Sequence, residues 1–205
     1  MVTKKAIKRW KNYSKISGVG QITRRYFVMN AFDGALTMLG VVIGAFVAGV
    51  LENSIIVISA GIAGSIAMGA SGISGAYMTE KAERTKKLKS LEKAMLTEMK
   101  DSIHGKSHRF AAIFAAIVDG FSPAMAAMAV VSPFFLSHFG FIEPEIAFYS
   151  CIFLTLLILT LLGIYLAKIS DENLLKYGIM MLFVGIITAV ICVGTSILLG
   201  GGTYI

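Results

Sequence analysis

The chain has 205 residues, of which 56% are hydrophobic and only 15% are charged. Soluble domains usually carry about 25% charged residues, so this composition excludes an ordinary water-soluble protein. The formal net charge is +7. Its Lys and Arg residues border apolar runs, where anionic lipid headgroups account for them, and nucleic-acid binding is not expected.

Five apolar stretches are each long enough to cross a bilayer, for which a helix needs roughly 20 residues. They leave no room for a separate soluble domain, and the first is too long for a signal-peptide core. The expected fold is all-α, a polytopic membrane protein with five transmembrane helices. The predicted spans are Tyr26–Leu51, Ser54–Met78, Phe110–Phe139, Glu145–Ala167 and Leu174–Leu199.

The distribution of basic residues predicts the topology. Seventeen of the nineteen Lys and Arg residues lie in segments 1–25 and 79–109. By the positive-inside rule both segments are cytoplasmic and the C-terminus is outside. The chain then divides into a basic N-terminal segment (1–25), spans one and two (26–78), a cytoplasmic amphipathic helical loop (79–109) and spans three to five (110–205).

Two carboxylates lie inside these spans. Of twelve acidic residues, only Asp33 and Asp119 fall in the interior of the long hydrophobic runs, since Glu145 stands at the start of its run, and each of the two is followed by glycine. A carboxylate in hydrocarbon is costly and persists where it faces a cavity, a proton or a cation. Asn30, Asp33 and Thr37 share one face of span one, so this face is predicted to line a cation pathway.

The face of span one continues outward through Gly40 and Gly44, a small-residue motif that allows a second helix to approach closely. Span two is also rich in small residues, and Met68 is the one large side chain on the face that holds Gly64 and Gly72. A thioether there either fills a gap or binds a soft cation. Asp33 and Met68 lie at similar depths, about 12 and 15 Å from the cytoplasmic ends of their spans.

The loop 79–109 has hydrophobic residues at helical spacing, with Glu80 and Glu83 among its lysines and His104 and His108 four residues apart. It is predicted to form an amphipathic helix, either a salt-bridged helix on the membrane surface or a relay that captures metal before the pore.

In span three, Pro123 has no amide hydrogen, so the carbonyl of Asp119 loses its helical partner. The result is either a tolerated kink or a freed carbonyl beside a carboxylate, as in cation sites of transporters. Asp119 lies about 15 Å beyond Arg109. Cys151 and Cys192, in spans four and five, are either packed thiols or a disulfide or soft-metal pair.

Several motifs resemble the vacuolar iron transporter family. They are Arg24-Arg25-Tyr26 leading into Asp33-Gly34, the Gly64–Gly69 run followed by Glu80-Lys81-Ala82-Glu83, and Asp119-Gly120 with Ser122-Pro123. The resemblance implies five membrane helices, a homodimer, and export of Fe(II) or Mn(II) from the cytosol by proton exchange. It assigns the metal-binding roles of the span-one aspartate to Asp33 and of the span-two methionine to Met68. Plant and fungal members insert a larger acidic domain after span two, where this chain has only about one helix.

The sequence therefore predicts a transporter without catalytic activity and without a resident cofactor, with Fe(II) or Mn(II) as substrate. The expected metal residues are Asp33, Met68, Asp119, Glu80 and Glu83, supported by Asn30, Thr37, Gly64, Gly72 and Pro123. Protons, membrane lipids and a second copy are the expected partners. The expected location is the cell membrane of a prokaryote, or a vacuolar or other organellar membrane of a eukaryote. The alternatives are a proton-coupled transporter of another small solute and a non-transporting scaffold or assembly protein.

Overall fold

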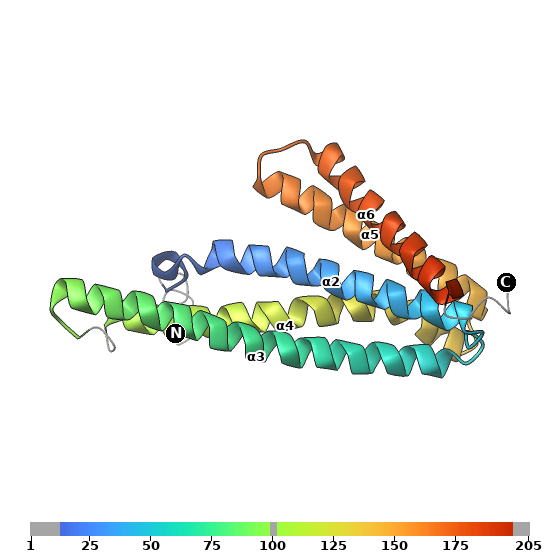
Figure 1. Ribbon diagram of the computed structural model, residues 1–205, viewed down its shortest axis with the longest axis horizontal. Coiled ribbons are helices and arrows are strands. Elements are labelled where there is room, and N and C mark those ends of the chain that lie inside the picture. The colour runs from blue at the N-terminus through green and yellow to red at the C-terminus, as the bar shows by residue number, and fades with distance from the viewer. Residues whose placement is uncertain (1–12, 99–101, 199–205) are drawn as a thin grey trace, which may run out of the picture. The chain divides into compact units, whose positions relative to one another are not determined.

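The computed structural model describes residues 13–98 and 102–198. The regular structure of this part is helical, and its five long helices are each apolar enough to cross a membrane. The predicted number of five membrane-spanning helices is thereby confirmed, although α2, α3 and α4 extend beyond the predicted apolar spans. The ends of the chain, including Ile205, lie outside the described residues. In chain order the helices are α2 (Val19–Val47), α3 (Ser54–Met95), α4 (Ile103–His138), α5 (Pro144–Ile169) and α6 (Leu174–Ser196) (Figure 1).

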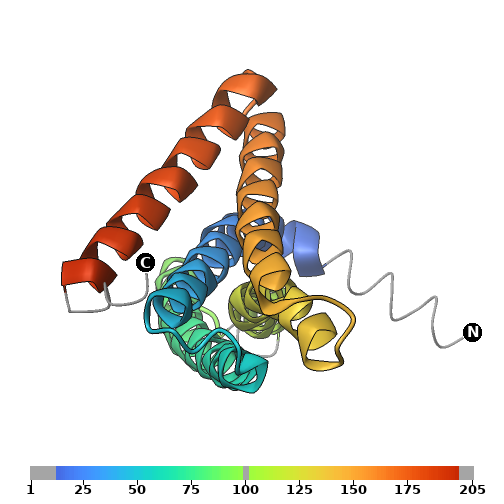
Figure 2. The same cartoon turned by 90° about the vertical axis from the view of Figure 1, so that its right-hand side faces the viewer.

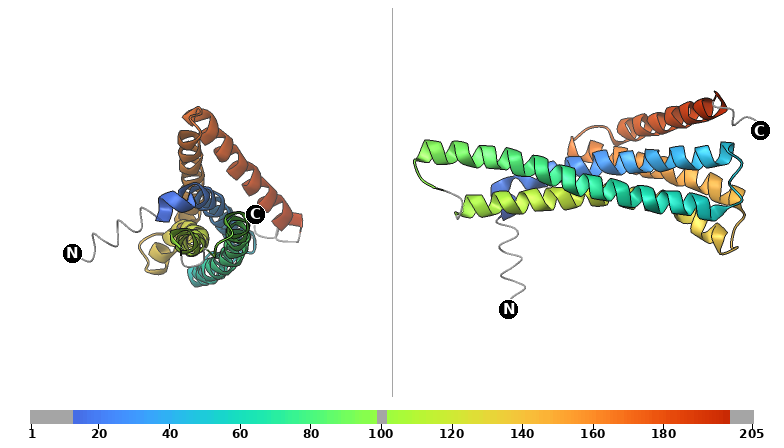
Figure 3. Two further views of the ribbon diagram at one scale, coloured as in Figure 1. Left: turned by 90° about the vertical axis from the view of Figure 1, so that its left-hand side faces the viewer. Right: turned by 60° about the horizontal axis from the view of Figure 1, so that its bottom comes forward.

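The segment 79–109 differs from its prediction in one respect. Its helical character is present, but residues 79–95 continue α3 rather than forming a helix of their own, and Figure 3 shows α3 as one unbroken ribbon. Residues from Ile103 onward already belong to α4. No Pro interrupts the sequence around Met78, so nothing local stops the helix where the chain becomes polar.

The starts of the last two helices follow from local sequence. Pro144 occupies the first turn of α5, where its missing amide hydrogen costs nothing, and Glu145 lies in the same turn. The helix thus begins one residue before Glu145, where the fourth span was predicted to start. Asn173 caps α6, since its side-chain oxygen accepts hydrogen bonds from the amides of Leu175 at 3.0 Å and Lys176 at 3.4 Å.

The chain packs as two compact units. The first unit comprises the described parts of residues 1–27 and 69–122, and the second comprises those of residues 28–68 and 123–205. In the first unit, Val19 of α2 is fully buried with Ala111 and Ala115 of α4, and the ring of Phe110 stacks on that of Phe114.

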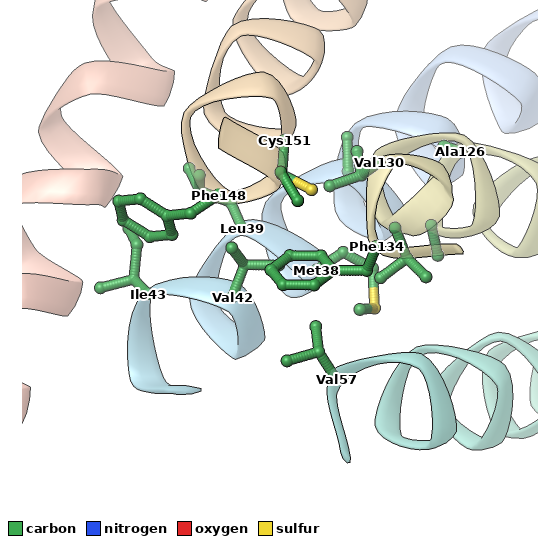
Figure 4. Packing of buried hydrophobic residues seen from close by; sticks show 14 of the residues in the cluster. Met38, Leu39, Val42, Ile43, Val57, Ala126, Val130, Phe134, Phe148 and Cys151 are labelled. Carbon is green, nitrogen blue, oxygen red and sulfur yellow. The ribbon is translucent and has the colours of Figure 1, made fainter. Parts of the chain in front are cut away.

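The second unit holds the larger hydrophobic core. Met38 and Leu39 of α2, Val57 of α3 and Phe134 of α4 are fully buried (Figure 4). Cys151 of α5 joins this core. Helices α5 and α6 form a hairpin with a short connection (Figure 2).

Many large apolar side chains remain exposed, above all along α6. Water would penalise such a surface, whereas lipid tails do not. The molecule is therefore an integral membrane protein, and the exposed apolar surface is the part that lipid or another subunit covers.

Candidate metal site

Asp33 lies in the middle of α2, and its side chain is exposed in the single chain. No hydrogen bond or ion pair engages it among the described residues. Thr37, one turn later on the same face, is also exposed, and Asn30 is half-buried. The predicted polar face of span one thus lies on the surface of the single chain, and the carboxylate of Asp33 is not buried in the core.

The glycine after each of the two aspartates has a packing role. A Cβ added to Gly34 would lie 2.7 Å from the Cα of Pro123, so the backbones of α2 and α4 touch there. In the first unit, a Cβ on Gly120 would lie 2.8 Å from the amide nitrogen of Ile73 in α3. Small residues permit such backbone contacts between membrane helices. Each Asp-Gly pair therefore places a carboxylate beside a close crossing of two helices.

Met68 is half-buried and packs against the core of the second unit. This contact fits the gap-filling role and leaves part of the side chain accessible. A Cβ on Gly64, one turn before Met68, would meet nothing within 4 Å. By contrast, a Cβ on Gly72 in the first unit would lie 2.7 Å from the Cα of Gly120. Gly64 therefore belongs to an open surface, and Gly72 to a helix contact.

Asp119 of α4 is half-buried. Pro123, whose ring removes the usual hydrogen bond to the Asp119 carbonyl, is buried against Gly34. The helix runs on through Pro123 and Pro133, so the proline does not end α4.

Glu80 is held by partners that the sequence analysis did not assign to it. The whole residue is only 4% exposed. Oε1 accepts a hydrogen bond from the Tyr26 hydroxyl at 3.0 Å, and Oε2 accepts one from Nε of Arg84 at 2.8 Å. Arg84 also donates from Nη1 to the carbonyl of Ser17 at 3.4 Å. Both carboxylate oxygens are thus already occupied, and a metal would have to compete with a buried ion pair.

Glu83, the other acid proposed for metal capture, is exposed on α3. His108 lies one residue before Arg109, ahead of the apolar run. Burial, followed by the positive charges of Arg84, His104 and Lys87, lowers the pKa of His108. Within residues 13–98 and 102–198, no three side chains of the His, Cys, Asp and Glu types come together as a possible metal cluster. The described part of the single chain therefore offers no ready-made cluster of three such ligands.

The contacts of Tyr26 and Arg84 with Glu80 were not predicted from the sequence. The spacing of Glu80 and Arg84 at i and i+4 on one helix was a usable signal for their pairing. Tyr26 is 54 residues from Glu80, and no local pattern links them. Cys151 and Cys192 are both free thiols, in agreement with the packed-thiol alternative.

Two comparisons with known proteins bear on this arrangement. The model of the VIT family matches residues 85–196, which is more than half of the chain. An uncharacterized protein of Methanocaldococcus jannaschii is 39% identical over 177 residues, which cover 84% of this chain and 88% of the relative.

Proposed function

The chain belongs to the VIT family, the vacuolar iron transporter family, and from this membership we propose that it exports Fe(II) or Mn(II) from the cytoplasm in exchange for protons. Members of this family are membrane transporters and not enzymes. The single observation that carries the proposal is the exposed, unengaged carboxylate of Asp33 in the middle of a membrane-spanning helix. Such a group is expensive in lipid unless a cation or proton uses it.

Asp33 and Met68 are the proposed direct ligands. An oxygen and a sulfur donor together suit borderline divalent metals better than Mg²⁺ or Ca²⁺, which take oxygen ligands. Because the carboxylate must be deprotonated to bind metal, binding and protonation compete at the same atom. This competition is the physical basis proposed for proton exchange, with Asp119 as a second carboxylate that carries a proton.

A homodimer would complete the site. A lone Asp33 and one thioether supply too few donors for a transition metal, which takes four to six ligands in proteins. Two small residues of these helices are open, since a Cβ on Gly44, about three turns beyond Asp33 on α2, or on Gly64, one turn before Met68 on α3, would meet nothing within 4 Å. A second copy placed on these small residues would bring a second Asp33 and a second Met68.

Flux into proteoliposomes tests the proposal. The full chain is reconstituted and supplied in turn with Fe(II), Mn(II), Zn(II) and Ca(II), with a pH indicator on the opposite side. We expect Fe(II) or Mn(II) flux together with proton counterflow, and no Ca(II) flux. Asp33→Asn should reduce metal flux to that of protein-free liposomes. Asp171→Asn is the matched control, because Asp171 is an exposed aspartate in the α5–α6 connection, and it should transport normally.

The same assay separates the alternatives. No flux of any metal by the unmodified protein would favour a scaffold or assembly protein. Proton movement driven by another solute would favour a different transporter. For the dimer, Gly64→Leu should convert the protein to a monomer by light scattering after size exclusion. Gly194→Leu is its control, because Gly194 of α6 is equally open. If the two variants had the same mass as the unmodified protein, the proposed interface would be wrong.

A further inference from the structure

A basic cavity lies in the first unit, between α3 and α4, where the polar segment 79–109 meets the apolar runs of the two helices. Its volume is about 460 Å³. Lys81 and Arg84 of α3 and Arg109 of α4 line it, whereas none of its lining residues is Asp or Glu. The carboxylate of Glu80 balances Arg84 from outside the lining. Lys81 and Arg109 therefore leave an excess of two positive charges around this space.

The guanidinium of Arg84 has an unused donor. Arg84 is 5% exposed; its Nε is bonded to Glu80 and its Nη1 to the carbonyl of Ser17. Its Nη2 is buried and has no hydrogen-bond partner. A buried donor left without an acceptor costs about 1–3 kcal/mol. Arg84 lines the cavity, which offers space for such an acceptor.

A second buried nitrogen borders the same cavity. Nδ1 of His108 has no hydrogen-bond partner, and the hydroxyl of Thr85 is also part of the lining. Lys81 is placed by its Nζ, which lies 5.4 Å from the centre of the Tyr77 ring. Cations and neutral donors thus converge on one space from two helices, which is the arrangement that binds an anion with several oxygens.

The chemistry and position of the cavity select its occupant. Ile113 and Tyr77, on its apolar side, are substantially exposed, and Arg109 directly precedes the apolar run that starts at Phe110. Basic pockets between membrane helices at this level suit lipid headgroups. We infer that this cavity binds the phosphate group of an anionic phospholipid, with Lys81, Arg84 and Arg109 around the phosphate and an acyl chain along Ile113. This inference does not rest on the proposed metal transport.

The test measures lipid binding to the delipidated full-length protein in detergent, from the shift in melting temperature on titration. The probes are phosphatidylglycerol, phosphatidylcholine and inorganic phosphate. The site variant is Lys81→Gln/Arg109→Gln, because neither residue engages in the Glu80–Arg84 pair. The control is Lys89→Gln/Lys106→Gln, which removes one lysine from each of the same two helices outside the cavity. Both variants lose two positive charges, so general attraction to anionic lipid falls equally.

We expect the site variant to bind phosphatidylglycerol at least about tenfold more weakly than the control variant, since two charge-assisted contacts are lost. Equal affinities of the two variants would overturn the inference, as would equally tight binding of phosphatidylcholine and phosphatidylglycerol. If inorganic phosphate stabilises the protein and displaces the lipid, the anion site stands and its assignment to a lipid is overturned. Should the double variant not fold, Arg109→Gln is compared with Lys106→Gln by the same criteria.

Discussion

The contact between Gly34 and Pro123 allows a sharp test of how α2 packs against α4. In Gly34→Ala, the added Cβ would lie 2.7 Å from the Cα and 2.8 Å from the carbonyl carbon of Pro123. Ordinary contact begins near 3.4 Å, so the backbones must separate by at least roughly 0.7 Å, which forfeits dispersion energy along the crossing. Backbone atoms cannot rotate away as a side chain can. We therefore expect a cost at the upper end of overpacking, about 3 kcal/mol.

For a chain of this size, about 3 kcal/mol corresponds to a fall in melting temperature of roughly 6–12 °C. The assay is thermal unfolding in detergent, followed by the fraction that remains monodisperse on size exclusion. The matched control is Gly75→Ala in the interior of α3, where the new Cβ meets nothing within 4 Å. It should be neutral or stabilising by up to about 1 kcal/mol, because Ala favours helix more than Gly does. Equal melting temperatures for the two variants would refute the packing argument.

Three further outcomes follow from the structure. Met68→Leu keeps apolar volume and removes the sulfur, so Fe(II) flux should fall while the melting temperature changes little; unchanged flux would leave Met68 as a packing residue only. Glu80→Gln breaks a buried ion pair and should destabilise the fold by about 3–5 kcal/mol. Glu83→Gln, on the surface, should change the free energy of unfolding by no more than about 0.5 kcal/mol. Equal stabilities of the two variants in chemical denaturation would contradict the Tyr26–Glu80–Arg84 arrangement. The folded-state pKa of His108 is lowered from 6.5, so the unfolded chain takes up a proton at higher pH than the folded chain does. Stability should therefore fall as the pH drops from above 6.5 through the folded-state pKa. His108→Gln should remove part of this loss of stability in phosphate-free buffer, and identical pH profiles of the two proteins would disprove the role of His108.

Substitutions of the two acids proposed for the cytoplasmic metal relay are expected to have different effects. The sequence offered Glu80 and Glu83 as equivalent candidates for metal capture. The structure holds Glu80 between Tyr26 and Arg84 and leaves Glu83 exposed. A loss of transport after substitution of Glu80 would therefore have to be separated from a loss of fold, while Glu83 tests metal capture directly.

The sequence by itself determined the number and places of the membrane helices. Hydrophobicity over about 20 residues is a local property, and burial in lipid acts on each segment separately, so the pattern along the chain was sufficient. Local signals also placed the start of the fourth span at Glu145, within one residue of the start of α5, and marked Asp33 and Asp119 as unusual. The chain's sequence did not indicate that residues 79–95 continue α3. The change from apolar to polar residues marks where the helix leaves the lipid, but the helical backbone is the same on both sides of that change.

Only the tertiary structure decided what each candidate residue touches. The hydrogen bond from Tyr26 to Glu80 joins residues 54 positions apart, and the glycines after the two aspartates acquire their role from helices that cross there. The exposure of Asp33 likewise depends on which face of α2 the core covers, and both faces contain apolar residues. Such contacts depend on how the shapes of side chains from distant parts of the chain fit together. The periodic pattern of one helix does not show which other helix it packs against.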